Sequence, residues 1–251
     1  MPLFQHDNLN FAYLDEGEPA GDPVILIHGF ASNKAVNWVG PGWVQALGDA
    51  GYRVLAIDNR GHGESDKPHD AQAYRPDKMA GDAAALLAHL RIDRAHVLGY
   101  SMGARIGAFL SLGAPEKVRS LVFGGLGMGM IDGVGDWEVI ADALLAPSLD
   151  AVTDPRGRAF RAFAEQTGGD RTALAACIST SRQHPTVEQA GAIEAPTLIA
   201  VGTKDDIAGS PRELAELMPN ATAIDIPGRD HMLAVGDRVF KQAVLEFLAA
   251  H

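Results

Sequence analysis

Short apolar segments of strand length alternate with longer amphipathic segments along most of the chain. Each of the six apolar runs ends at a turn or polar residue, and they cover residues 23–28, 52–58, 95–100, 118–125, 195–202 and 221–226. Helical spacing of apolar positions runs through residues 77–90, 101–114, 210–219 and 237–250. Strands and helices in alternation predict an α/β fold, a mostly parallel sheet with helices on both faces. Residues 4–15 predict an antiparallel pair at one edge.

Residues 126–182 interrupt this alternation. Three helical pieces occur there, at 136–146, 156–166 and 172–181, and none of the segment has a strand pattern. We therefore expect a small helical cap, or lid, inserted after the strand at 118–125, which is the sixth strand when the antiparallel pair is counted. The α/β core would then be made of residues 1–125 and 183–251. Ligands of open α/β sheets bind beyond the carboxyl ends of the strands, so a lid at this point would cover that edge.

Composition narrows the classes of partner. The chain has 251 residues, 47% of them hydrophobic, which is enough for a sizeable core. Twenty-one basic against thirty-two acidic residues give a net charge of -11, which argues against nucleic acid, anionic membranes and highly anionic substrates. We expect no stable membrane association, because no stretch reaches the roughly 18 apolar residues that cross a bilayer.

The same features predict a cytoplasmic protein. The chain begins without a basic segment followed by an apolar block, so no targeting segment is visible. Its single cysteine, Cys177, cannot form an internal disulfide, which suits a reducing compartment. Because Cys177 lies in a helical segment among apolar neighbours, we expect it in the core.

The strongest chemical signal follows the strand at 95–100. Gly99, Ser101 and Gly103 form a G-x-S-x-G pattern between that strand and the helix at 101–114. The glycines permit a tight strand-to-helix turn that would expose the Ser101 hydroxyl at the edge of the sheet. This context distinguishes a nucleophile from an ordinary turn serine.

A serine nucleophile needs a base, and the base needs a group that orients it. His231 lies on the loop between the last strand and the last helix, at the edge where Ser101 emerges. Asp205 and Asp206 both follow the strand at 195–202, and we favour Asp205 as the acid. The chain order Ser, Asp, His is one known arrangement of a catalytic triad.

Acyl transfer also needs donors for the oxyanion. The backbone N–H of Met102, directly after the nucleophile, is one candidate. The second is the N–H of Phe30, on the loop after the strand at 23–28. His28, which precedes it, is interpreted as a hydrogen-bonding residue of that loop.

Five motifs in order make the chain resemble the serine hydrolases of the α/β-hydrolase superfamily, and its carboxylesterases in particular. They are HGF at 28–30, DNRGHGES at 58–65, GYSMGA at 99–104, VGTKDD at 201–206 and GRDHM at 228–232. The resemblance implies Ser101 as nucleophile, Asp205 as acid and His231 as base. It implies the amides of Phe30 and Met102 as the oxyanion hole, and it implies neither a metal nor an organic cofactor. DNRGHGES is similar to a structural turn of the family, and we assign it no chemistry.

We expect cleavage of small uncharged carboxylic esters with short or medium acyl chains, through an acyl-enzyme intermediate. The residues expected to line the substrate pocket are apolar, and several are flexible. They are Met128, Met130, Trp137, Met232 and Leu233, together with Phe30.

Three other functions stay open at this stage. A thioesterase for coenzyme A esters fits the same triad. GYSMGAR at 99–105 also resembles the menaquinone-pathway lyases of the superfamily, in which Arg105 would bind a substrate carboxylate. A ligand sensor that retains the triad is the third, and the oligomeric state is left open.

Overall fold

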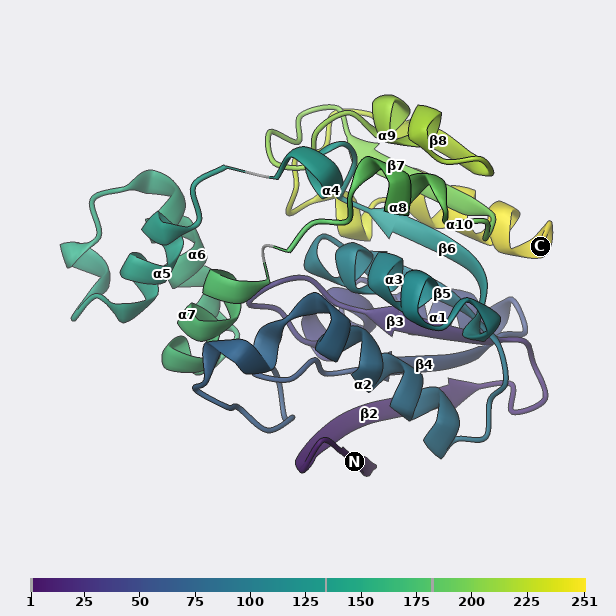
Figure 1. Ribbon diagram of the computed structural model, residues 1–251, viewed down its shortest axis with the longest axis horizontal. Helices are drawn as coiled ribbons and strands as arrows, with labels where there is room; N and C mark the ends of the chain where they lie inside the picture. Colours follow the sequence, from purple (N-terminus) through teal and green to yellow (C-terminus); the bar gives the residue numbers. More distant parts are fainter. Residues whose placement is uncertain (1, 134, 182) are drawn as a thin grey trace.

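A twisted eight-stranded sheet forms the centre of the fold (Figure 1). The computed structural model describes residues 2–133, 135–181 and 183–251. Along the sheet the strand order is β1-β2-β4-β3-β5-β6-β7-β8. The strands are β1 (Leu3–His6), β2 (Leu9–Gly17), β3 (Pro23–Ile27), β4 (Arg53–Ile57), β5 (Ala95–Tyr100), β6 (Val118–Gly124), β7 (Thr197–Gly202) and β8 (Ala221–Ile226).

The sheet is parallel except at one edge, as the sequence predicts. Only the pairs β1–β2 and β2–β4 are antiparallel, and every other neighbouring pair runs parallel. The central strand β3 is apolar on both faces, because helices cover both sides of the sheet there. In β3, Val24 and Leu26 point into one buried cluster, and Ile25 and Ile27 point into the other.

Helices cover the two faces of the sheet. On one face lie α2 (Pro76–His89), α3 (Met102–Gly113) and α9 (Pro211–Leu217); on the other lie α1 (Trp43–Asp49) and α10 (Arg238–Ala249). Short helical turns complete the core: η1 (Ala35–Val39), η2 (Ala71–Tyr74), η3 (Pro115–Lys117) and η5 (Ala234–Gly236). Within the described ranges, no helix is both long and apolar enough for a membrane span.

The sequence pattern did not predict η1 and α1. Gly40, Pro41 and Gly42 separate two short pieces, so neither piece is long enough to show helical periodicity. What holds α1 is a tertiary contact: the Trp43 ring meets Phe240 of α10 at a centroid distance of 5.0 Å. Its indole N–H donates to the carbonyl of Val235 at 2.7 Å.

The segment between β6 and β7 is helical, as predicted. It holds α4 (Gly129–Asp132), α5 (Glu138–Leu145), η4 (Leu149–Ala151), α6 (Pro155–Gln166), α7 (Arg171–Thr180) and α8 (Val187–Gly191). Helices α6 and α7 both pack against α5, and the three gather at one end of the molecule (Figure 1). Cys177 of α7 is buried, as expected. That residues 126–182 act as a lid stays a prediction.

The turn from β5 into α3 is sharp and closely packed against the sheet. Ser101 adopts φ 54° and ψ −114°, a backbone conformation that residues other than glycine rarely adopt. A Cβ on Gly103 would lie 1.9 Å from the carbonyl oxygen of Ile27 in β3. A Cβ on Gly99 would lie 2.2 Å from the carbonyl oxygen of Gly103. Both glycines are therefore required by the close approach of α3 to the sheet.

We expect Gly103→Ala to lower the free energy of unfolding by about 3 kcal/mol, because α3 or β3 must move to admit the methyl group. Urea unfolding followed by circular dichroism measures the change. Gly113→Ala is the matched control in the same helix: its Cβ would have no neighbour within 4 Å, and the expected change stays within about 1 kcal/mol. Equal stability of wild type and Gly103→Ala would contradict the packing argument.

Candidate active site

Three side chains from separate loops meet at one edge of the sheet. The Ser101 hydroxyl oxygen lies 3.0 Å from Nε2 of His231, and Nδ1 of His231 lies 2.8 Å from Oδ2 of Asp205. Ser101 follows β5, Asp205 follows β7, and His231 follows β8. The carboxyl ends of these parallel strands bring together residues that lie up to 130 positions apart.

Asp205, and not Asp206, faces the histidine. Its Oδ1 accepts the amides of Ile207 and Ala208, both at 2.9 Å, which leaves Oδ2 for the imidazole. The Asp205 side chain is fully buried. Asp206 points away and lines a different surface cavity, together with Glu213.

Hydrogen bonding fixes which imidazole nitrogen of His231 carries the proton. A carboxylate accepts hydrogen bonds, so Nδ1 donates to Asp205 and Nε2 keeps a lone pair toward the Ser101 hydroxyl. This is the arrangement in which a serine can donate its proton to a neutral base.

Tyr100 holds the backbone of His231 through a hydrogen bond, a role that the sequence did not predict. Its hydroxyl donates to the backbone carbonyl of His231 at 2.6 Å. Burial, with the charges of Asp205 and Asp230, raises the pKa of Tyr100 well above its ordinary value, so the phenol stays a donor. Its position inside an apolar strand gave no signal of this contact.

Two backbone N–H groups near Ser101 have no hydrogen-bond acceptor among the described residues. Met102 is the first residue of α3, where an N–H has no acceptor within the helix. Among the described residues, the amides of Met102 and Phe30 donate to no other group. The loop that carries Phe30 runs close to Ser101. A Cβ atom placed on Gly29 would lie 3.4 Å from the Cβ of Ser101.

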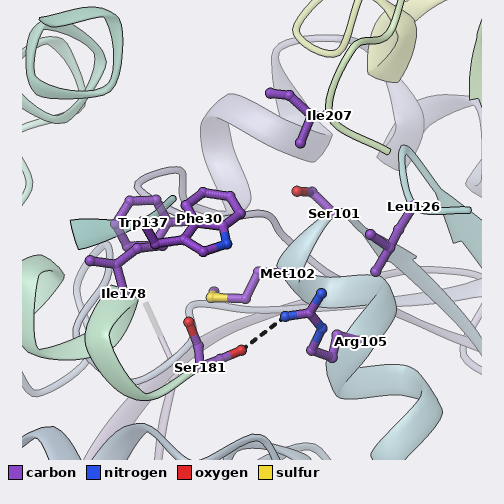
Figure 2. Close-up of a pocket in the computed structure, with 9 residues that line it drawn as sticks. All are labelled: Phe30, Ser101, Met102, Arg105, Leu126, Trp137, Ile178, Ser181 and Ile207. Atoms are coloured by element: carbon purple, nitrogen blue, oxygen red, sulfur yellow. Dashed lines mark hydrogen bonds between the residues drawn. The ribbon is translucent and has the colours of Figure 1, made fainter. Parts of the chain in front are cut away.

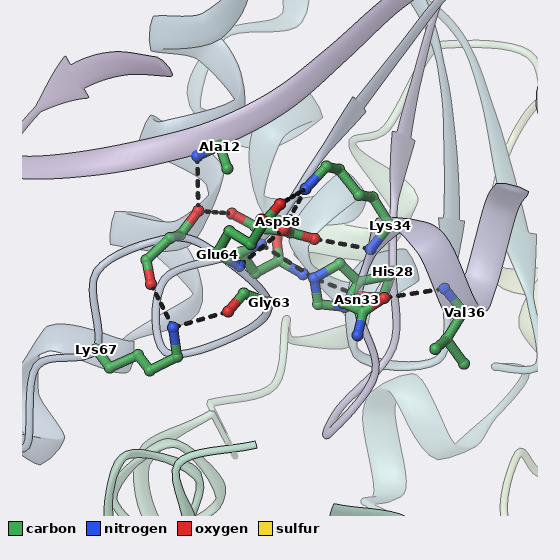
Figure 3. A network of polar contacts seen from close by, with 11 residues as sticks. Ala12, His28, Asn33, Lys34, Val36, Asp58, Gly63, Glu64 and Lys67 are labelled. Atoms are coloured by element: carbon green, nitrogen blue, oxygen red, sulfur yellow. Dashed lines mark hydrogen bonds and ion pairs between the residues drawn. The ribbon is translucent and has the colours of Figure 1, made fainter. Parts of the chain in front are cut away.

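The Phe30 loop is anchored at its ends by the turn that follows β4 (Figure 3). At the first end, Nε2 of His28 accepts the amide of Asn59 at 3.0 Å. At the other, Asp58 accepts the Lys34 amide at 2.8 Å and the Lys34 ammonium at 2.5 Å. Burial opposes the charge of Asp58. The His28 ring, the hydrogen bonds from Lys34 and the backbone N–H of Glu64 nevertheless hold the pKa of Asp58 below its ordinary value. The predicted structural turn DNRGHGES thus holds the loop.

Two adjoining cavities open onto Ser101, and Phe30 and Trp137 line both. The inner cavity measures about 30 Å³ and is drawn in Figure 2. Its other lining residues are Met102, Arg105, Leu126, Ile178, Ser181 and Ile207. The outer cavity is larger, about 280 Å³, and has an apolar lining. Met232 and Leu233 lie at its mouth, half exposed.

Two of the expected pocket residues lie elsewhere. Met130 is 1% exposed and packs into the core, because α4 turns it inward. Met128 lines the surface cavity beside Asp206. Their places are taken by Phe160 and Phe163 of α6, which line the outer cavity. An aromatic pair three positions apart on a predicted helix was a signal that could have found them.

Arg105 is a buried cation at the inner cavity. Its guanidinium donates to the carbonyls of Ser181 at 3.1 Å and Gly129 at 3.2 Å, and its Nε has no partner among the described residues. No described carboxylate pairs with it. Burial lowers the pKa of Arg105 to about 10, so it is charged at neutral pH.

Over residues 2–133, 135–181 and 183–251, the structure has no group of three or more His, Cys, Asp or Glu side chains placed to hold a metal ion.

The chain is similar to several known proteins. The family model described as the alpha/beta hydrolase fold matches residues 22–146. A Mycobacterium tuberculosis protein, provisionally named non-heme bromoperoxidase BpoC, is 32% identical over 89% of this chain and 91% of its own length. A Bacillus subtilis protein, provisionally named 2-succinyl-6-hydroxy-2,4-cyclohexadiene-1-carboxylate synthase, is 32% identical over 46% of this chain and 40% of its own.

A solved structure has the same fold as this chain. The crystal structure of a hydrolase from Pseudomonas aeruginosa PA01 aligns with a TM-score of 0.81 and 26% identity, over 98% of this chain and 97% of that one. The chain therefore belongs to the α/β-hydrolase superfamily. These relatives carry different activities in their names, so the family does not define the substrate.

We expect the free energy of unfolding to fall when the pH is lowered from about 7 to about 4. Burial lowers the pKa of His62 to about 3 and also lowers that of His28. In this window these two histidines bind more protons in the unfolded chain than in the folded one, so their titration in acid favours unfolding. His62 alone would contribute about 3 kcal/mol. Urea midpoints across this range measure the effect, and a His62→Gln variant with an unchanged pH dependence would contradict it.

Proposed function

We propose that the protein is a serine hydrolase that cleaves small uncharged carboxylic esters, with short or medium acyl chains, through an acyl-enzyme intermediate. The observation that carries this proposal is the continuous chain of hydrogen bonds from Ser101 through His231 to Asp205, next to two backbone amides that donate to no other described group. Its membership of the α/β-hydrolase superfamily supports hydrolytic chemistry.

The proposed reaction has two halves. Ser101 attacks the ester carbonyl while Nε2 of His231 takes its proton, and the imidazolium is stabilised by Asp205. The amides of Phe30 and Met102 hold the oxyanion, a contribution of about 3 kcal/mol for one such donor. His231 then protonates the leaving alcohol. Water repeats the sequence on the acyl-enzyme and releases the carboxylic acid.

The cavities suggest how an ester would lie. An apolar group fits the outer cavity, which Phe160, Phe163 and Trp137 line, and the small inner cavity would take the other end of the substrate. Residues 126–182 supply those three aromatic rings, so in this proposal the lid both completes the pocket and excludes water.

We expect Ser101→Ala and His231→Ala to abolish turnover of p-nitrophenyl esters without unfolding the protein. Asp205→Asn should lower kcat by about 10⁴-fold, because the imidazole then loses its orientation and its favoured tautomer. Asp206→Asn is the matched control and should keep kcat within about threefold, because its side chain faces another cavity. Comparable turnover in Ser101→Ala would refute the assignment.

An intact-mass measurement after treatment with a fluorophosphonate tests the nucleophile directly, and a chain-length series of p-nitrophenyl esters measures the size of the pocket. A single adduct is expected on the wild type and none on Ser101→Ala. A stoichiometric burst with a retained acyl group would instead favour a ligand sensor over an esterase.

Arg105 favours a second candidate, in which the substrate carries a carboxylate. A buried guanidinium that has, among the described residues, no partner for its Nε and no acidic partner is a costly arrangement, and an anionic ligand in the inner cavity would relieve it. The name of the Bacillus relative includes a carboxylate. A lyase of this kind would eliminate pyruvate from an anionic enoyl substrate and would leave esters intact. The negative net charge disfavours this candidate, but the local charge at Arg105 supports it.

Two esters of similar length test whether a hydrolase substrate carries a carboxylate: p-nitrophenyl butyrate, and the mono-p-nitrophenyl ester of glutaric acid. Turnover of neither ester, with pyruvate release from an anionic enoyl substrate, would favour the lyase. If Arg105 binds a carboxylate, Arg105→Met should lower kcat/KM for the anionic ester by about 10- to 100-fold and change the neutral ester little. Comparison within one variant controls for any loss of stability. Equal losses for both esters would exclude a carboxylate contact.

A further inference from the structure

The middle of the Phe30 loop holds an unusual backbone conformation. Ala31, the residue after Phe30, has φ 57°, the left-handed region, which costs a residue with a side chain about 1 kcal/mol or more. Such a conformation persists only where neighbouring groups hold it. Two contacts hold this one: the Ala31 amide donates to Nε2 of His62 at 3.1 Å, and the Ala31 carbonyl accepts the Thr167 hydroxyl at 2.8 Å.

The His62 ring is set up to accept that amide. Nδ1 lies 2.9 Å from the carbonyl of Arg60, which can only accept, so the ring proton is on Nδ1 and the lone pair is on Nε2. The side chain is 1% exposed, and burial lowers its pKa to about 3, so the ring is neutral at neutral pH. It meets the Phe30 ring edge-on at a centroid distance of 6.0 Å.

This contact lies one residue from a proposed oxyanion donor. Hydrogen-bond donors to an oxyanion act within a narrow range, about 2.7–3.1 Å, so a small rotation of the Phe30 peptide would weaken the bond. The ends of the loop are fixed at His28 and Lys34, as described above. Between those ends, Nδ1 of His28 and Oδ1 of Asn37 hold the carbonyl and the amide of Gly29, and His62 holds the next peptide, at the Ala31 amide.

We propose that His62 is a positioning residue for acyl transfer: by accepting the Ala31 N–H on Nε2, it holds the Phe30 amide in the direction that the oxyanion requires. The proposal rests on the proposed hydrolase function. It gives a role in the reaction to the DNRGHGES turn, to which the sequence assigned no chemistry. Thr167 binds the other side of the same residue from the helical segment, so the core and that segment hold Ala31 together.

Two substitutions of His62 separate positioning from packing. Gln places an oxygen acceptor near the position of Nε2, whereas Leu fills the space and offers no acceptor. We expect His62→Leu to lower kcat for a p-nitrophenyl ester by about 10- to 100-fold with KM within about twofold, and His62→Gln to recover most of that loss. A trifluoromethyl ketone, whose adduct places an oxyanion at the same amides, should lose affinity for His62→Leu in proportion to kcat.

His96→Leu is the matched control. His96 is also buried, and its Nδ1 makes a 2.8 Å hydrogen bond with Ser120, but it lies near the start of β5, away from Ser101. Both Leu variants lose a buried histidine, so both should be less stable. Only His62→Leu should lose kcat and trifluoromethyl ketone affinity. Equal kinetic losses in the two variants would overturn the proposal, and so would an unchanged kcat in folded His62→Leu.

A measurement on the wild type does not depend on activity or on how a variant folds. The N–H···N hydrogen bond joins two nitrogens, so ¹⁵N-labelled protein should show a scalar coupling between the Ala31 amide and Nε2 of His62. A protonated Nε2, or no coupling at this site, would overturn the proposal. Failure of the hydrolase function would appear differently, as no adduct at Ser101 and no turnover in the wild type.

Discussion

The close contact between the start of α3 and the end of β3 is the constraint on which the rest of the site depends. Because Gly103 has no side chain, the helix can approach the Ile27 carbonyl, and the chain must turn sharply at Ser101. That turn has three consequences. It exposes the hydroxyl, it directs the first amide of α3 toward the same space, and it places the loop after β3 next to the serine.

Most of the polar groups that hold the loop after β3 are buried, and nearly all of them are paired within the fold. Asp58 with Lys34, and His28 with Asn59, satisfy one another without solvent. A buried network of this kind is stable only when each member has a partner, so it fixes one conformation of the loop. Arg105 departs from this rule, because its charge is buried without a carboxylate among the described residues. In the second candidate function, an anionic ligand would supply this missing partner.

The helical segment after β6 contributes to the site in a way that its own sequence does not reveal. It supplies Trp137, Phe160 and Phe163 to the cavities, and Thr167 to the backbone of Ala31. Met128 and Met130, which seemed equally suited to a pocket, lie in another cavity and in the core. Both groups are apolar, so only the placement of their helices in the fold distinguishes them.

Sequence alone determined the parallel sheet, the helical insertion and the turn at Ser101, because these follow from local periodicity and from glycines at fixed spacing. It also favoured Asp205 over Asp206 as the residue that would orient His231. Only the tertiary structure shows which carboxylate faces the imidazole, since this depends on which side chain the amides of Ile207 and Ala208 turn toward His231. The helix at Trp43, the contact of Tyr100 with His231 and the contact of His62 with Ala31 likewise emerged only from the structure. Each of them joins residues distant in sequence, and no local pattern encodes such a pairing.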